Sequence, residues 1–124
     1  MRKVTFSPGE FLFRQGDQTY FFFMIEEGEV DVLIQDPKGG EVLLATVGSG
    51  QPVGEFALIT RTPRVASARA KSQTVAIQIS QAGYEKLLAE LPDWAVSLIT
   101  ELVERLKKTD QRLAELQART SGST

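Results

Sequence analysis

The chain has 124 residues, of which 42% are hydrophobic and 24% charged, the balance of an ordinary globular domain. Its 14 basic and 16 acidic side chains leave a net charge of -2, so no overall field attracts nucleic acid or anionic lipid. It contains neither cysteine nor histidine. Disulfides, thiolate and imidazole metal sites and the commonest general base are thereby excluded, and only a carboxylate site for Mg²⁺ or Ca²⁺ stays open.

The length suits one domain with a single core. No apolar run approaches the roughly 20 residues that are needed to span a bilayer. The first residues, Met1 to Lys3, are not followed by the apolar region of a signal peptide. We therefore expect a cytoplasmic protein without a membrane partner.

The first part of the chain has the pattern of short strands separated by turn residues. In the run 30–34, Val30, Val32 and Ile34 alternate with other residues and should face inward. Turns recur about every 8–12 residues, which is typical of a sandwich or barrel, closed as in a lipocalin or a jelly roll. The expected strands cover residues 4–6, 11–13, 20–25, 30–34, 42–47, 65–70 and 74–79.

Helical spacing replaces the strand pattern after residue 79. Ser80 is a candidate N-cap for a first helix, whose apolar residues lie within 84–91. Pro92 breaks this helix and can begin the next one. The second helix is expected over about 93–118, followed by a flexible tail at 121–124.

The second helix carries an apolar seam with spacings of 4, 3, 4, 3, 4 and 3 residues. Its members are Ala95, Ile99, Leu102, Leu106, Thr109, Leu113 and Leu116. Such a repeat over about three heptads favours a coiled-coil dimer, while a helix packed on its own barrel is the alternative. Thr109 is the single polar member, and a polar residue in such a seam can set the register.

The segment before the last two strands carries the candidate site. Glu55 follows Gly54, and nine positions later Arg64 follows Pro63. Glycine lets the backbone approach a ligand closely, a carboxylate accepts hydrogen bonds from hydroxyls, and the planar fork of arginine suits a phosphate. The pair therefore indicates a small ligand with a hydroxyl end and a phosphate end. Two solvated side chains, or a local salt bridge between them, are the alternatives.

The runs Gly54–Ile59 and Pro63–Ser67 closely resemble the phosphate-binding cassette of cyclic nucleotide-binding domains. The resemblance extends over nearly the whole chain, because the segments 6–17, 22–28 and 48–50 fall where that family has its barrel turns. It is greatest to the sensor half of bacterial catabolite-activator (cAMP receptor protein)-type regulators, since a long helix follows the barrel.

This resemblance implies a mainly β fold with C-terminal helices. A double-stranded β-helix (jelly-roll) barrel over about 4–79 would precede a short helix and a long dimerisation-type helix over about 80–118. Residues 1–120 would then form one cyclic nucleotide-binding domain, which acts as a regulatory sensor without catalysis or a cofactor.

The resemblance also assigns roles to individual residues. Glu55 would accept a hydrogen bond from the ribose 2′-hydroxyl, and Arg64 would hold the equatorial oxygen of the cyclic phosphate. Thr109 falls at the position that bonds the adenine 6-amino group in catabolite-activator-like proteins. The implied cAMP-binding set is Gly54, Glu55, Phe56, Ala57, Arg64, Val65 and Ala66 in the cassette, Val32, Leu44, Ala45, Val47 and Val53 around the base and ribose, and Arg105, Leu106 and Thr109 on the long helix.

Two departures from the family pattern bear on the ligand. A threonine after the cassette arginine favours cGMP in eukaryotic relatives, so Val65 indicates cAMP, with cGMP as the other candidate. Val53 replaces the larger residue of many members, a mild change in pocket volume. The DNA-reading helix-turn-helix of the bacterial regulators is missing, so no direct nucleic-acid contact is expected of this chain. We expect either a stand-alone sensor or a piece of a longer protein, dimeric through its long helix.

Two other functions are compatible with a barrel of this kind. A cupin-like metal enzyme is disfavoured because such sites rely on barrel histidines. A dimerisation or interaction domain with a degenerate, ligand-free pocket is the stronger alternative, although the intact Glu55 and Arg64 argue against it.

Overall fold

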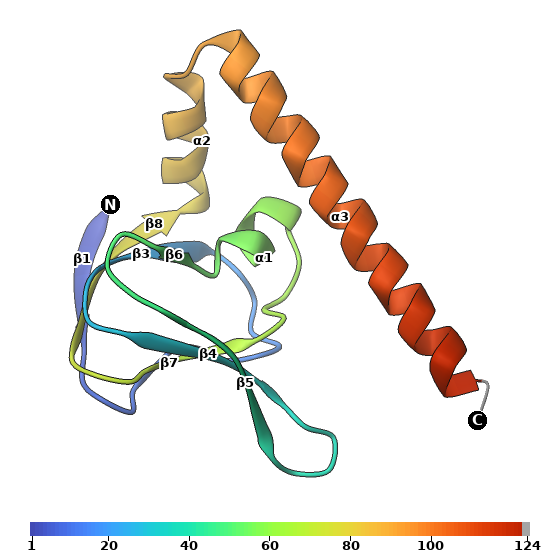
Figure 1. Ribbon diagram of the computed structural model, residues 1–124. Coiled ribbons are helices and arrows are strands. Elements are labelled where there is room, and N and C mark those ends of the chain that lie inside the picture. Colours follow the sequence, from blue (N-terminus) through green and yellow to red (C-terminus); the bar gives the residue numbers. More distant parts are fainter. Residues whose placement is uncertain (123–124) are drawn as a thin grey trace. The chain divides into compact units, whose positions relative to one another are not determined.

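A computed structural model describes the backbone of residues 1–122 and the side chains of residues 1–106 and 108. The backbone divides into two compact units (Figure 1). Met1–Lys86 contains all the described strands, and Leu87–Thr124 contains the long helix.

The strands form two four-stranded antiparallel sheets, with the orders β1-β8-β3-β6 and β2-β7-β4-β5. Their bounds are β1 Arg2–Phe6, β2 Phe11–Phe13, β3 Phe21–Glu27, β4 Val30–Gln35, β5 Glu41–Val47, β6 Pro52–Val53, β7 Ser67–Ala70 and β8 Thr74–Ser80. Neighbours in a sheet are mostly distant in sequence, as in a jelly roll. The arrangement confirms the predicted class, a jelly-roll-like β fold followed by C-terminal helices.

The helices are α1 (Glu55–Thr60), α2 (Gln81–Ala89) and α3 (Asp93–Gly122). Ser80 caps α2 as predicted, because its Oγ accepts a hydrogen bond of 3.1 Å from the N–H of Gly83. Helix α3 continues past the predicted end near residue 118 and includes Ser121 and Gly122 of the expected tail. Residues 123–124 lie outside the described part of the chain.

The core of the first unit joins residues from both sheets. Phe23 lies at its centre, where the rings of Phe6 and Phe21 pack edge-on with centroids 5.5 and 5.3 Å away. Buried alanines on β7 and β8, such as Ala68 and Ala76, leave room for these large rings. The aromatic content that predicted strands therefore also fills the space between them.

Strand β6 is not among the strands expected from the sequence. Pro52 and Val53 pair with Met24 and Phe23 of β3. Two residues are too few to show a strand period, so only the tertiary pairing reveals this strand. It carries the chain directly into the segment that begins α1.

The predicted inward face of β4 is only partly correct. Val30 is buried and Val32 packs against the core, but Ile34 is only half-buried. Leu33, which alternation places on the other face, is buried as well. Both faces of β4 are therefore partly covered, which a strict alternation does not anticipate.

Helix α3 exposes an apolar stripe in the described part of the second unit. Trp94, Leu98, Leu102 and Leu106 follow one another at intervals of four residues and are all exposed. Leu102 and Leu106 belong to the predicted seam, so a dimer through this helix stays a prediction. In residues 1–122, no helix has the length and apolar content to cross a membrane.

Candidate functional site

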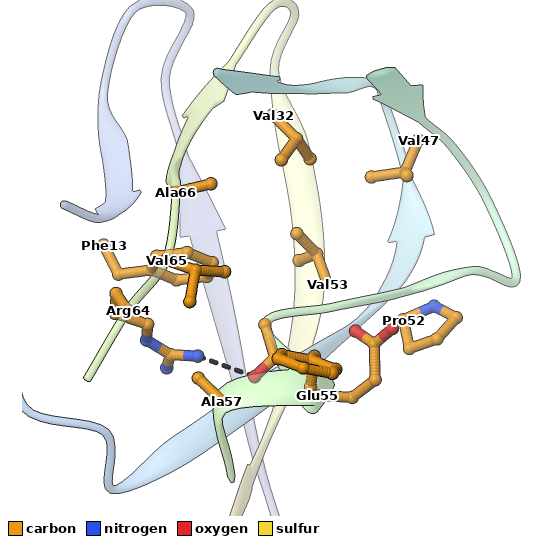
Figure 2. A pocket seen from close by; sticks show the side chains of 12 residues that line it. Phe13, Val32, Val47, Pro52, Val53, Glu55, Ala57, Arg64, Val65 and Ala66 are labelled. Carbon is orange, nitrogen blue, oxygen red and sulfur yellow. Dashed lines mark hydrogen bonds between the residues drawn. The ribbon is translucent and has the colours of Figure 1, made fainter. Parts of the chain in front are cut away.

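A cavity of about 200 Å³ lies in the first unit, beside α1 (Figure 2). Its lining residues are Phe13, Val32, Val47, Pro52, Val53, Gly54, Glu55, Phe56, Ala57, Arg64, Val65 and Ala66. Most of these side chains are apolar. The two charged ones, Glu55 and Arg64, therefore determine which polar groups a ligand can present here.

Two left-handed backbone residues bound α1. Gly54 precedes the helix with φ of 81°, and Arg61 ends it with φ of 57°. The N–H of Thr62 then donates to the carbonyl of Ala57 at 3.0 Å. Glycine adopts this conformation without strain, which explains the residue type just before Glu55. The short helix thus has fixed ends and holds Glu55 at the cavity wall.

The loop at residues 16–17 holds the backbone of Arg64. The N–H of Gly16 donates to the carbonyl of Arg64 at 2.8 Å, and the N–H of Arg64 donates to the carbonyl of Asp17 at 2.9 Å. Nearby, the hydroxyl of Thr19 donates to the carbonyl of Thr62 at 2.9 Å. These long-range bonds, rather than local sequence, place Arg64 at the cavity.

The side chain of Arg64 is buried, with only 3% of the residue exposed. Its Nη1 donates to the carbonyl of Gly54 at 2.7 Å, as the dashed line in Figure 2 shows, and its Nη2 donates to the carbonyl of Phe21. Its Nε is buried and has no hydrogen-bond partner in the described part of the chain. A guanidinium has five N–H donors, so these bonds leave donor capacity unused.

Burial lowers the pKa of Arg64 to about 10, because desolvation disfavours the cation, while the charges of Asp17 and Glu55 oppose this shift. The side chain is therefore protonated at neutral pH. A buried cation with incomplete hydrogen bonding is costly unless an anion reaches it. This arrangement favours a negatively charged ligand.

Phe13 is a wall residue that the sequence analysis did not select. The guanidinium carbon of Arg64 lies 3.9 Å from the centroid of the Phe13 ring and 5.8 Å from that of Phe21. A methyl group added to Gly54 would collide with Nη1 of Arg64 and lie 2.8 Å from Cε2 of Phe13. The apolar run Phe11–Phe13 could have indicated a buried Phe13, but not which cation it contacts.

Glu55 is half-buried at the start of α1. The structure gives its carboxylate neither a hydrogen bond nor a salt bridge among the described residues, so the predicted alternative of a bridge to Arg64 is not observed there. An unpaired carboxylate at a cavity wall can accept hydrogen bonds from ligand hydroxyls.

The cavity brings the predicted cassette residues together with Val32, Val47 and Val53. Leu44 and Ala45 do not line it, which corrects the expectation that they form its wall. Both are exposed, Leu44 at 55%, on the edge strand β5. The register of β5 against β4 shifts there, since Ala45 pairs with Val32 but Leu43 pairs with Leu33, and Leu44 is left as the extra residue.

The predicted ligand contacts on α3 belong to the second unit. Arg105 forms a salt bridge of 3.4 Å with Glu101, and Leu106 is exposed. The side chain of Thr109 lies outside the described residues. The ligand contacts of these residues stay predictions.

A second hollow, a groove of about 390 Å³, adjoins the C-terminal end of α1. Its lining residues are Gln18, Thr19, Tyr20, Leu58, Arg61, Thr62, Pro63, Gln81 and Glu85. Three of its polar side chains interact with one another. Arg61 pairs with Glu85 at 3.5 Å, and Gln81 donates to the same carboxylate at 3.1 Å.

Known proteins are similar to this chain in both sequence and fold. The sequence profile of the cyclic nucleotide-binding domain matches residues 3–90. The chain belongs to the cyclic nucleotide-binding domain family. The cavity with Glu55 and Arg64 lies within the matched residues.

This chain has among its relatives a kinase regulatory subunit and a transcriptional regulator. It is 32% identical over 93 residues to the cAMP-dependent protein kinase regulatory subunit of Blastocladiella emersonii, covering 75% of this chain and 23% of the relative. It is 30% identical over 106 residues to the cAMP-activated global transcriptional regulator CRP of Salmonella typhimurium, covering 85% and 50%. The crystal structure of the Thermus thermophilus catabolite activator protein matches with a TM-score of 0.74 and 29% identity, covering 94% and 55%. The chain thus spans about half or less of the length of these proteins.

Proposed function

We propose that this domain is a regulatory sensor that binds cAMP and performs no catalysis of its own. The single observation that carries the proposal is the buried cation of Arg64, which lines a mostly apolar cavity and keeps a buried Nε without a partner in the described part of the chain. A cyclic phosphate supplies the missing acceptor. The names of the relatives, a cAMP-dependent kinase subunit and a cAMP-activated regulator, support the same ligand.

In this proposal the two charged residues bind opposite ends of the ribose phosphate. Arg64 donates charge-assisted hydrogen bonds to the cyclic phosphate, and Glu55 accepts one from the ribose 2′-hydroxyl. The backbone amides of the cassette, at Phe56 or Ala57 and at Val65 and Ala66, add further donors. Val32, Val47 and Val53 contact the ribose and the base.

The size of the cavity indicates that the walls do not enclose the whole nucleotide. Its volume of about 200 Å³ is below the roughly 300–1,000 Å³ of pockets that enclose drug-sized ligands. Part of the nucleotide would therefore extend beyond these walls. Arg105, Leu106 and Thr109 of α3 are proposed to contact the exposed base, with Thr109 at the adenine 6-amino group.

The base preference rests on Val65, which provides no hydroxyl beside Arg64. A threonine at that position favours cGMP in eukaryotic relatives, so we propose cAMP before cGMP. Val65 lines the cavity although 55% of it is exposed, which is compatible with contact to the edge of a ligand.

Helix α3 is proposed to transmit the bound state to a second copy and to another domain or partner. Its exposed stripe of Trp94, Leu98, Leu102 and Leu106 would become buried in a homodimer. A ligand shifts such an equilibrium only by its different affinity for the two helix arrangements. We place this regulator in the cytoplasm and propose no direct contact of this chain with nucleic acid.

A ligand-free dimerisation domain is the second candidate, and one observation favours it. Arg64 already donates to the carbonyls of Gly54 and Phe21, so the protein itself satisfies part of the hydrogen-bonding capacity of the guanidinium. The two candidates differ in whether the cavity accepts a nucleotide.

Calorimetric titration with cAMP, with cGMP and with linear 5′-AMP as a control separates them. We expect one cAMP per chain, weaker cGMP and much weaker 5′-AMP. Thermal unfolding should show roughly 2.7 kcal/mol of stabilisation with cAMP at 100 times its dissociation constant. Light scattering reports whether the chain is a dimer. Absence of heat and of stabilisation with both cyclic nucleotides would contradict the sensor and favour the dimerisation domain.

A further inference from the structure

We infer that Phe13 is a positioning residue that fixes the guanidinium plane of Arg64 for an anionic ligand. The inference rests on the proposed function, because it assigns to Phe13 a share of the affinity for the cyclic phosphate. Phe13 donates no hydrogen bond to a ligand and acts through the arginine.

The geometry makes Phe13, Gly54 and Arg64 one packed unit. The guanidinium carbon lies 3.9 Å from the centroid of the Phe13 ring, which is a stacking distance. On the same side chain, the carbonyls of Gly54 and Phe21 each receive one N–H. The ring limits tilt of the guanidinium plane, and the two carbonyls limit its rotation within that plane.

This packed unit requires a residue without a Cβ at position 54. A methyl group there would meet Nη1 of Arg64 and would come within 2.8 Å of Cε2 and 3.0 Å of Cζ of Phe13. The glycine backbone, the ring and the guanidinium are therefore in close mutual contact. The unpartnered Nε belongs to this same fixed plane.

A ring stabilises the cation in a way that an aliphatic residue of similar volume cannot. The face of an aromatic ring is negative, so it partly offsets the desolvation of a buried cation. Leucine at position 13 would fill the wall but would leave the plane of Arg64 free to tilt. The donors would then have to be oriented at the time of binding, which lowers affinity.

The same strand contains a natural control. Phe11, two residues before Phe13 on β2, carries the guanidinium of Arg14 at 3.9 Å from its ring centroid. That pair has the same stacking distance, but neither residue lines the cavity, and Arg14 is exposed. Comparing the two phenylalanines separates positioning of the phosphate donor from stacking in general.

The experiment compares Phe13→Leu, Phe13→Met and Phe11→Leu with the wild-type chain. Each is titrated with cAMP, which carries the phosphate, and with adenosine, which does not. We expect both Phe13 variants to bind cAMP roughly tenfold more weakly, an effect between those of an exposed and a desolvated cation–π contact. Their adenosine affinity, and both affinities of Phe11→Leu, should stay within about twofold of wild type.

Nuclear magnetic resonance tests the contact between each ring and its guanidinium directly. A ring shifts the resonances of protons above its face, so Phe13→Leu should move the Nε–H signal of Arg64, and Phe11→Leu that of Arg14. The dispersion of the remaining amide signals reports whether each variant is folded. If Phe13→Leu is not folded, Phe13→Met replaces it in the comparison.

The outcomes distinguish this inference from the proposed function. If the wild-type chain binds neither cyclic nucleotide, both fail. If it binds cAMP but the Phe13 variants lose cAMP and adenosine affinity equally, or lose neither, Phe13 only shapes the wall and the positioning role is overturned. Selective loss of the cAMP affinity in the Phe13 variants, with a moved Arg64 signal, supports it.

Discussion

The two hollows beside α1 differ in how their polar groups are satisfied. In the cavity, the Nε of Arg64 is buried without a partner and the Glu55 carboxylate has no bond among the described residues. In the groove, Arg61 pairs with Glu85, which also accepts from Gln81. The groove has the larger volume, about 390 against about 200 Å³. Unused hydrogen-bonding capacity among mostly apolar wall residues, rather than cavity volume, thus distinguishes the candidate ligand site.

Replacing the central cation of the cavity gives the largest expected effect. Arg64→Ala should weaken cAMP binding by about 3–5 kcal/mol, since two or more charge-assisted hydrogen bonds are lost at roughly 1.5–3 kcal/mol each. Calorimetry measures the change, with Arg61→Ala as the matched loss of an arginine from the groove. An affinity equal to that of the wild type in Arg64→Ala would show that the nucleotide, if it binds, lies elsewhere.

The close packing at Gly54 gives the next largest effect. Gly54→Ala should lower the free energy of unfolding by about 3 kcal/mol, because a left-handed alanine costs roughly 1–2 kcal/mol and overpacking against Arg64 and Phe13 adds a similar amount. Urea unfolding provides the measurement. Gly9→Ala is the control, since Gly9 has a similar φ of 89° with nothing within 4 Å of the added carbon. Equal losses of unfolding free energy in the two variants would contradict close packing of Gly54 against Arg64 and Phe13.

The cavity and the groove also differ in how far they could be predicted from the sequence. The strand pattern, the Ser80 cap and the presence of Glu55 and Arg64 at one cavity could be predicted from local sequence. Phe13 could not be matched to Arg64, because loop residues 16–17 and the carbonyl of Phe21, distant in sequence, orient the arginine.

Other features depend on how strands pair. The family resemblance placed Leu44 and Ala45 around the base and ribose, but both lie on the edge strand β5, whose residues 41–46 are all exposed. Strand β6 exists only through its pairing with β3. The groove combines the end of α1 with Gln81 and Glu85 of α2, and no local pattern joins these segments.

The smallest expected effect comes from the ion pair in the groove. Arg61 and Glu85 have side chains that are 76% and 56% exposed, and such surface pairs contribute about 0.2–1 kcal/mol. Glu85→Gln, which keeps the shape of the side chain, should therefore lower the free energy of unfolding by less than about 1 kcal/mol and leave cAMP affinity unchanged. Raising the salt concentration should shrink even this difference, because exposed charges are screened. A large loss of cAMP affinity in Glu85→Gln would mean that the groove is energetically coupled to the cavity through α1. The difference in hydrogen bonding would then not be enough to distinguish the ligand site from the groove.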